Sequence, residues 1–365
     1  MPTNKKLKIT LFIGSLTGGG AERVISNLAN YLVGKGHEVE VLTMSDVADT
    51  YKLDERVTKT TLITRNERKN VLYNALIRFK RLSKYLKNKE CDCYVVMLPI
   101  TITMMLLLRS KTKAKVIASE RNDPSTYTGY MKKILIKLAK RADGYVFQTE
   151  NAKTWYKDSI RACLTAIIPN AINEEFIHAP YNGKRTKRIV AAGRLKTQKN
   201  FNVLIEAYSK IADEFPEYDL IIYGEGEKRA ELQDLINNLG LSRRVNLPGY
   251  TLTLGLSIED CSLFVLSSDY EGMPNALMEA MALGLPCIST DCPIGGPRFL
   301  IKNKVNGLLV PVGNIDKMSE AMKLVLANKN FADQLGENAS EISDRLNPQK
   351  IYDQWERFIY SVVDS

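Results

Sequence analysis

Short apolar runs alternate with longer amphipathic stretches along the whole chain. Residues 7–13, 115–119, 189–192 and 263–266 are such runs, and nearly every position in them is apolar or small. That pattern is typical of strands buried on both faces of a parallel sheet. Because stretches of helical periodicity separate the runs, the sequence predicts an α/β chain.

The same pattern divides the chain into two parts. Residues 144–148 and 165–168 are the last strand candidates before a polar stretch with Pro180, Asn182 and Gly183. The 365 residues suit two domains of ordinary size. We therefore expect an N-terminal domain over residues 1–170, a linker over 171–186, a C-terminal domain over 187–346 and a last helix over 347–365.

The stretch after the strand 263–266 carries the densest candidate chemistry. Gly272 allows close approach of the backbone to a ligand, and Asn275 is a candidate cap for a helix over 276–283. The first N–H groups of such a helix form an anion site suited to a diphosphate. Glu271 and Glu279 would flank one bound molecule. The alternative is a capped helix with two solvated glutamates.

The longer sequence around the two glutamates favours a ligand-binding role for them over solvated side chains. Glu271 and Glu279 lie within the sequence EGMPNALMEAMALGLPCISTDCPIGGPR. It resembles the signature of the retaining, nucleotide-sugar-dependent glycosyltransferases of family 4, including bacterial enzymes that extend undecaprenyl-diphosphate-linked oligosaccharides, such as N-acetylgalactosaminyltransferases. The resemblance implies the GT-B fold, in which two Rossmann-like, doubly wound domains face a central cleft. It also implies that the last helix crosses back to the first domain.

Two cations follow the first strand of the second part. Arg194 and Lys199 lie in GRLKTQKN, ahead of a helix N-terminus, where they are placed to neutralise a diphosphate. This segment is similar to a second motif of the family. The resemblance implies catalytic roles for Glu271, Arg194 and Lys199. It implies donor contacts from Gly18, Gly19, Gly20, Arg194, Lys199, Tyr250, Glu271, Gly272, Met273, Pro274, Asn275, Ala276, Leu277 and Glu279.

The glycine turn Gly18-Gly19-Gly20 lies between a predicted strand and a predicted helix over 21–33, which together make a phosphate-accepting shape. It does not match the dinucleotide-binding spacing, so a purely structural turn explains it equally well. In the resembled family such a turn faces the phosphate of the donor.

Residues 69–89 and 130–141 predict two basic amphipathic helices. In the first, Leu72, Leu76, Phe79, Leu82 and Leu86 form the apolar stripe. A surface helix packed on the sheet and an interfacial, phosphate-binding helix both fit this pattern. On the second interpretation Lys69, Arg78 and Arg81 contact the acceptor.

Arg121 and Asn122 follow the strand 115–119, where the resemblance implies an acceptor-binding loop. Many relatives carry a histidine there, and this chain has Arg121. A surface ion pair of Arg121 with Glu120 or Asp123 is the alternative.

The distribution of charge along the chain limits the classes of molecule that the protein is expected to bind. The net charge is +10, yet residues 1–186 carry 32 Lys and Arg against 17 Asp and Glu, whereas residues 187–365 carry 19 against 24. The basic first half predicts an anionic partner: a phosphate-bearing acceptor, a membrane surface or a nucleic acid. We expect no nucleic acid, because no binding motif for it accompanies the charge.

Six cysteines show neither disulfide nor zinc spacing, and no signal peptide is evident, which indicates a reducing, cytoplasmic location. The longest uncharged stretch, residues 93–108, is too short to span a bilayer. No acidic pair suggests a metal site, and we expect no cofactor.

We therefore expect a retaining glycosyltransferase, peripheral on the inner face of the plasma membrane. It would move a hexose or N-acetylhexosamine from a UDP-sugar to a polyprenyl-diphosphate-linked glycan, in bacterial surface polysaccharide or glycoprotein glycan assembly. A nucleotide-sugar epimerase on the same fold, and a non-catalytic partner of a two-chain transferase, remain as alternatives. The oligomeric state is not predicted.

Overall fold

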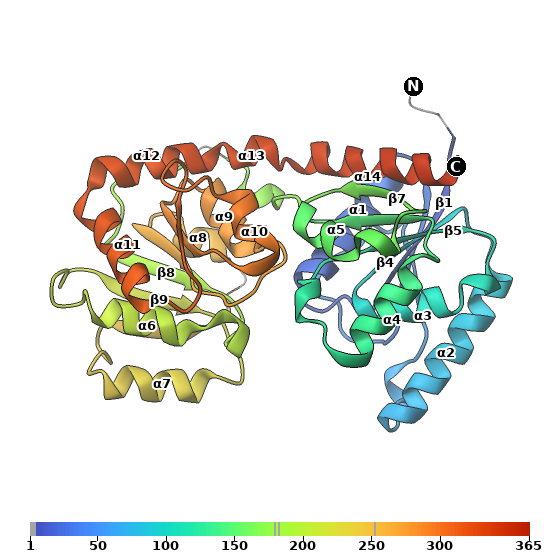
Figure 1. Ribbon diagram of the computed structural model, residues 1–365, viewed down its shortest axis with the longest axis horizontal. Coiled ribbons are helices and arrows are strands. Elements are labelled where there is room, and N and C mark those ends of the chain that lie inside the picture. The colour runs from blue at the N-terminus through green and yellow to red at the C-terminus, as the bar shows by residue number, and fades with distance from the viewer. Residues whose placement is uncertain (1–4, 179, 182, 252) are drawn as a thin grey trace. The chain divides into compact units, whose positions relative to one another are not determined.

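The structure, a computed structural model, describes residues 5–178, 180–181, 183–251 and 253–365. The chain forms two units (Figure 1). The first contains the residues up to Asn170 together with Gln349–Ser365, and the second contains Ala171–Pro348. The C-terminal segment thus returns to the unit in which the chain begins.

A parallel sheet of seven strands forms the centre of the first unit, in the order β3-β2-β1-β4-β5-β6-β7. Its strands are β1 (Lys8–Ile13), β2 (Glu38–Thr43), β3 (Thr58–Thr61), β4 (Cys93–Met97), β5 (Lys115–Ser119), β6 (Gly144–Phe147) and β7 (Leu164–Ile167). The order reverses beside β1, and ligands bind at the carboxyl ends of strands at such a switch point.

Helices cover both faces of this sheet. They are α1 (Gly20–Gly34), α2 (Val71–Asn88), α3 (Pro99–Leu107), α4 (Gly129–Ala139), α5 (Glu150–Tyr156) and α14 (Pro348–Val363). Figure 1 shows α14 along one side of the sheet and α2, α3 and α4 on the other. Each helix between parallel strands runs back from the carboxyl edge, so its first turn lies at that edge.

The helix α14 completes the core of the first unit. Its Trp355 is fully buried, and Tyr352 contacts Tyr31 of α1 with ring centroids 5.5 Å apart. A Cβ on Gly144 of β6 would lie 2.8 Å from Val362, so only glycine allows this strand to approach the helix so closely.

The second unit holds a parallel sheet of six strands, in the order β10-β9-β8-β11-β12-β13. Its strands are β8 (Arg188–Ala192), β9 (Asp219–Tyr223), β10 (Val245–Gly249), β11 (Leu263–Leu266), β12 (Cys287–Thr290) and β13 (Leu308–Val310). Its helices are α6 (Phe201–Ser209), α7 (Arg229–Asn238), α8 (Leu254–Ile258), α9 (Asn275–Ala282), α10 (Gly296–Leu300), α11 (Ile315–Ala327), α12 (Lys329–Ser340) and α13 (Ile342–Arg345).

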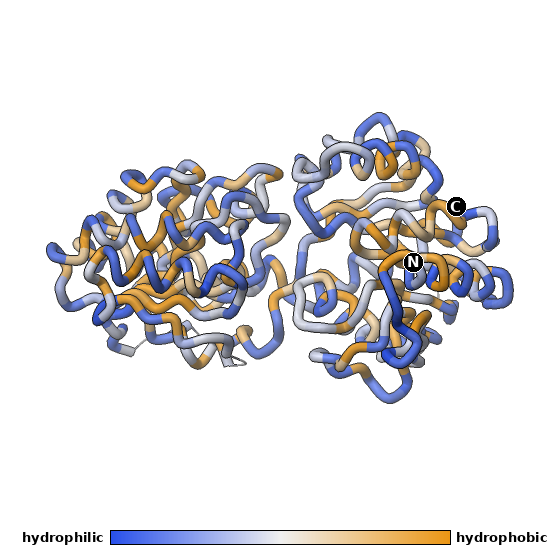
Figure 2. Tube along the Cα trace, turned by 90° about the horizontal axis from the view of Figure 1, so that it is seen from below, coloured by the Kyte–Doolittle hydropathy of each residue, from blue (hydrophilic) through white to orange (hydrophobic). Residues whose placement is uncertain are grey.

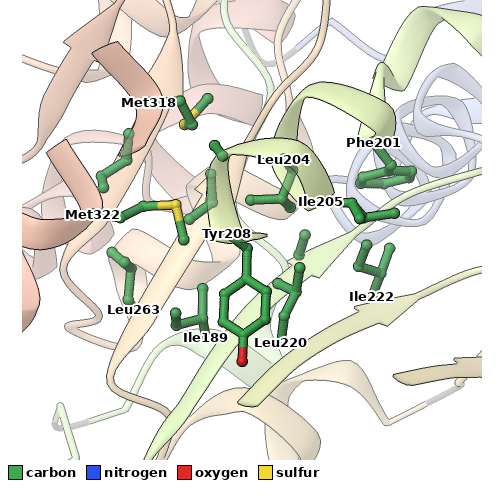
Figure 3. Packing of buried hydrophobic residues seen from close by; sticks show 14 of the residues in the cluster. Ile189, Phe201, Leu204, Ile205, Tyr208, Leu220, Ile222, Leu263, Met318 and Met322 are labelled. Carbon is green, nitrogen blue, oxygen red and sulfur yellow. The ribbon is translucent and has the colours of Figure 1, made fainter. Parts of the chain in front are cut away.

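Apolar side chains from α6, α11 and the central strands fill one face of this second sheet (Figure 3). Tyr208 lies among them and donates its hydroxyl to the carbonyl of Tyr218 at 2.5 Å, so its polar end is satisfied in the core. Figure 2 shows hydrophobic stretches of the trace in both units, interspersed with hydrophilic ones. The predicted α/β architecture with two Rossmann-like parallel sheets is confirmed.

Candidate active site

The loop 267–274 joins β11 to α9 at the carboxyl edge of the second sheet. Glu271 and Met273 are buried in it. The sequence placed Asn275 at the helix cap, and this is wrong: Pro274 occupies the cap position in extended conformation, and Asn275 is the first helical residue. The amides of Ala276 and Leu277 have no carbonyl partner within the helix, because the first turn of any helix leaves its N–H groups unpaired there.

Lys199 and Glu271 meet at this edge. The ammonium of Lys199 lies 2.5 Å from Oε1 of Glu271, and the side chains are 17% and 9% exposed. The hydroxyl of Ser268 donates to the same carboxylate oxygen at 2.7 Å. Lys199 ends a short 3-10 helix, Thr197–Lys199, which follows β8. The two predicted catalytic residues, far apart in sequence, therefore form one ion pair.

Further hydrogen bonds join the two loops that carry this pair. The amide of Asp269 donates to the carbonyl of Gln198 at 2.9 Å, and the side chain of Asn200 donates to the Asp269 carboxylate at 2.7 Å. Ser267 donates its hydroxyl to the carbonyl of Lys199 at 2.9 Å. These contacts make the loops after β8 and β11 a single wall of the site.

A third loop, between β12 and α10, closes against the second. A Cβ on Gly296, the first residue of α10, would lie 1.7 Å from the carbonyl oxygen of Gly272, so a larger residue would push the start of α10 away from the second loop. Arg298 of α10 forms an ion pair with Asp291 of this third loop.

Three further residues predicted to bind the donor occupy different positions in the second unit. Arg194 follows β8 and is exposed. Tyr250 follows β10 and is 68% exposed. Glu279 lies in α9 and is buried. Arg194 and Tyr250 thus lie at the carboxyl edge, and Glu279 lies about one turn into the helix.

The glycine turn lies in the first unit, after β1. Helix α1 begins at Gly20, with Gly19 in extended conformation at the cap position, and Gly18 is exposed. The residues predicted to bind the donor are therefore divided between the two units, at the carboxyl edge of each sheet.

The alternative of a surface ion pair for Arg121 is wrong. Arg121 is only 7% exposed, and its guanidinium donates to Ser119 Oγ, to the carbonyl of Ile168 and to Asn170 Oδ1 at 2.9, 3.3 and 3.1 Å. It also lies 5.1 Å from the ring centroid of Trp355. Burial lowers the pKa of Arg121 to about 9. Asn122, next to it, is exposed.

Sequence reasoning missed Glu120, which is 1% exposed. Its carboxylate accepts hydrogen bonds from the hydroxyls of Tyr127 and Tyr156, at 2.9 and 2.8 Å, and from the amides of Arg121 and Asn122, at 3.0 and 3.1 Å. Glu120 thereby fixes the backbone of the loop that presents Asn122. The only signal in the sequence was its position directly after a buried strand.

Comparison with known proteins identifies the family. The model "Glycosyl transferases group 1" matches residues 173–342, and the model "Glycosyltransferase Family 4" matches residues 18–176. Together they account for most of the chain. The protein is a family 4 glycosyltransferase.

The curated relatives of this glycosyltransferase include two bacterial proteins. It is 26% identical to an alpha-1,4-N-acetyl-D-galactosaminyltransferase of Campylobacter jejuni named for the acceptor GalNAc-GalNAc-diNAcBac-PP-undecaprenol, over 98% of this chain and 100% of the relative. It is 27% identical to an exopolysaccharide phosphotransferase of Streptomyces coelicolor over 94% of this chain, but it spans only 40% of that protein's length.

Among solved structures, HepE of Anabaena in complex with UDP and glucose is 19% identical and has a TM-score of 0.84, covering 97% of this chain and 100% of that chain. A likeness at this identity shows the fold.

Of the three cations predicted to contact the acceptor, Arg78 and Arg81 lie on α2 of the glycosyltransferase and Lys69 precedes it, and their surroundings differ. Arg81 pairs with both carboxylate oxygens of Glu67, at 2.5 and 2.8 Å. Lys69 lies over the ring of Tyr73, 4.9 Å from its centroid. Arg78 donates to the carbonyl of Met44 at 3.3 Å and to Ser45 Oγ at 2.6 Å.

The described residues of the glycosyltransferase lack two features. None of its described helices is both long and apolar enough to cross a bilayer. No three or more His, Cys, Asp or Glu side chains in the described ranges are grouped so as to hold a metal ion.

Proposed function

We propose that this glycosyltransferase moves a hexose or N-acetylhexosamine from a UDP-sugar to a polyprenyl-diphosphate-linked glycan, with retention of the anomeric configuration. The observation that carries the proposal is the ion pair of Lys199 and Glu271 beside the first turn of α9. A half-buried cation, a carboxylate and helix amides in one place match the needs of a sugar joined to a diphosphate.

In the proposed reaction, the bond from the anomeric carbon to the UDP oxygen breaks while an acceptor oxygen bonds to the same face of that carbon. Arg194, Lys199 and the amides of Ala276 and Leu277 stabilise the negative charge that develops on UDP. The leaving phosphate oxygen takes the proton of the acceptor hydroxyl, so the reaction requires no protein base, metal or cofactor.

The two glutamates then have separate roles. Glu271 accepts hydrogen bonds from the hydroxyls of the donor sugar, and Glu279 accepts from the ribose. A histidine base is not part of this scheme: His37 is buried, accepts from the amide of Leu7 at 3.2 Å and contacts Glu356 at 3.1 Å.

The acceptor side of the proposal rests on the first unit. Asn122 is exposed at the carboxyl edge of its sheet, on a loop that Glu120 holds in place. The basic charge of the first half and the relative from Campylobacter jejuni support an acceptor with a diphosphate and an isoprenoid chain. We place the protein on the inner face of the plasma membrane, bound through α2 and α4.

The test is transfer by the purified protein. A panel of UDP-sugars is incubated with and without a bacterial lipid extract, and UDP release and labelled sugar in the organic phase are measured. We expect one donor to give both signals, and NMR of the product to show the anomeric configuration of the donor.

Lys199→Met should reduce kcat about 100-fold or more, as expected when a group that stabilises the leaving charge is lost. Lys196→Met is the matched control, because Lys196 is exposed on the same loop, and its activity should equal that of the wild type. Turnover of a nucleotide sugar without any acceptor product would favour the epimerase. A folded protein that releases UDP from no donor would favour a partner subunit and contradict the proposal.

A further inference from the structure

The guanidinium groups of Arg68 and Arg78 both contact one short segment of the chain, residues 44–46. Arg78 of α2 donates to the carbonyl of Met44 and to the hydroxyl of Ser45, and Arg68 donates to the carbonyl of Asp46. This segment directly follows β2, so both guanidinium groups lie at the carboxyl edge of the first sheet. The same edge carries the loops of Gly18 and Asn122.

No carboxylate of the described residues forms an ion pair with either of these two groups. Among the described residues, neither Arg68 nor Arg78 forms an ion pair, and their partners at residues 44–46 are neutral oxygens. Arg81, less than a turn along the same helix, is instead paired with Glu67 on both carboxylate oxygens. The positive charge of Arg68 and Arg78 therefore remains available for an anion.

The two guanidinium groups are also close enough to repel each other. Burial, and then the positive charge of Arg68, lower the pKa of Arg78. Like charges held together with no counter-charge are unfavourable, and a phosphate group between them would remove the repulsion. Arg68 is exposed and Arg78 is half-buried, so a ligand can reach both.

The helix that carries Arg78 also exposes apolar side chains. Leu72, Leu76 and Phe79 of α2 are 72%, 63% and 40% exposed and lie on one face of the helix. Figure 1 shows α2 extending away from the sheet of its unit. A ligand that joins a phosphate to a hydrocarbon chain would contact both the two arginines and these apolar side chains, whereas a soluble phosphate would contact only the arginines.

We infer that Arg68 and Arg78 bind the diphosphate of an isoprenoid-linked acceptor, with the hydrocarbon chain along Leu72, Leu76 and Phe79. The inference rests on the proposed function for the identity of the acceptor. Compared with the acceptor contacts predicted from the sequence, it adds Arg68 and leaves out Arg81, because Glu67 already neutralises the charge of Arg81.

Direct binding tests the site without requiring transfer. Farnesyl diphosphate, inorganic pyrophosphate and farnesol are titrated calorimetrically into the full-length protein, in a Lys199→Met background that weakens the candidate diphosphate site of the second unit. We expect farnesyl diphosphate to bind most tightly. Arg78→Met and Arg68→Met should each weaken it about tenfold or more, as for loss of a charged hydrogen bond.

Lys80→Met and Arg81→Met are the controls, because each removes one positive charge from the same helix. Both should leave the affinity within about twofold of the background protein. Equal losses from all four substitutions would overturn the site, since only the overall charge would then matter. Unchanged binding in Arg78→Met and Arg68→Met would also overturn it.

A second arm distinguishes an acceptor from a bilayer headgroup. Vesicles of phosphatidylcholine with phosphatidylglycerol are sedimented with the same variants. If Arg78→Met reduces vesicle binding but not the binding of farnesyl diphosphate, the ligand is a headgroup and the assignment is wrong. If farnesyl diphosphate binding depends on Arg78 while no donor is turned over, the site stands and the proposed transfer fails.

Discussion

Two buried carboxylates, Glu120 and Glu271, are held in different ways. Glu271 has an ammonium group, that of Lys199, at 2.5 Å. Glu120 accepts only from two tyrosine hydroxyls and two amides. Because these donors are neutral, burial dominates and raises the pKa of Glu120. The two residues should therefore respond differently to substitution.

Glu120→Gln should change how stability depends on pH. In the unfolded chain a glutamate loses its proton near pH 4.3, whereas folded Glu120 keeps its proton to a higher pH. Just above pH 4.3 the folded state thus binds more protons than the unfolded state, and stability falls as pH rises. The unfolding free energy of the wild type, measured in urea from about pH 4 upward, should fall relative to that of the variant. A wild-type unfolding free energy that rises with pH relative to that of the variant would contradict this.

The pair of Lys199 and Glu271 should be coupled in stability. Lys199→Met leaves a buried carboxylate without its cation and should cost about 1–3 kcal/mol. Adding Glu271→Gln should recover part of this loss, so the double variant should be more stable than the sum of the single variants by about 0.5–3 kcal/mol. Denaturant unfolding of the four proteins measures the coupling, and strict additivity would show that the pair does not interact.

At the scale of elements, α2 consists of two unlike halves. Leu82 and Leu86 are buried against the unit, whereas Leu72 and Leu76, on the same predicted stripe, are largely exposed. The interpretation of this helix as packed along its whole stripe is therefore wrong for its first half. The helix extends beyond the sheet, so its first turns have nothing to pack against.

Alanine substitutions should reveal this division. Leu82→Ala should lower the unfolding free energy by about 2–5 kcal/mol, because it leaves a cavity. Leu76→Ala should change it by no more than about 0.5 kcal/mol, because the side chain is already in solvent. Denaturant unfolding of both variants measures the difference, and equal losses would show that the first half of α2 is packed in solution.

The same exposed residues should bind membranes if our placement of the protein is right. A double variant, Leu72→Gln with Leu76→Gln, should bind phosphatidylglycerol vesicles more weakly than the wild type, because less apolar surface enters the bilayer. Val312→Gln is the control, since Val312 is 38% exposed in the second unit. Sedimentation with vesicles measures the binding, and equal binding of all three proteins would refute the role of α2.

At the scale of the whole molecule, each unit has its own sheet and core, and the first needs the end of the chain. Trp355 of α14 is fully buried against residues that precede it by more than two hundred positions, including Arg121. The first unit is therefore complete only after α14 has been synthesised.

Trp355→Ala should destabilise the first unit selectively. Removal of a buried tryptophan costs about 3–5 kcal/mol, and Trp355 belongs to the first unit. Hydrogen exchange followed by mass spectrometry should show faster exchange across β1, β4, β5 and β6 and little change across β8 to β13. Equal acceleration in both sheets would mean that the two units unfold as one.

Periodicity and composition were sufficient for the elements. The predicted bounds of β11 match the structure, and those of α2 and α14 differ by two residues or fewer. Local sequence succeeds here because burial on both faces demands unbroken apolar runs, and amphipathic helices repeat every three to four residues. The positions of Glu271, Lys199 and Arg194 after strands also followed from the sequence, through the resemblance to the family.

The sequence by itself thus determined the α/β architecture, the family and the residue types at the carboxyl edges. Only the tertiary structure decided that Arg81 pairs with Glu67 and Lys199 with Glu271, and that Arg68 and Arg78 contact the same segment, residues 44–46. It also decided that Arg121 is buried and that half of an apolar stripe is exposed. Pairing and burial depend on distances between segments far apart along the chain, and local patterns do not contain those distances.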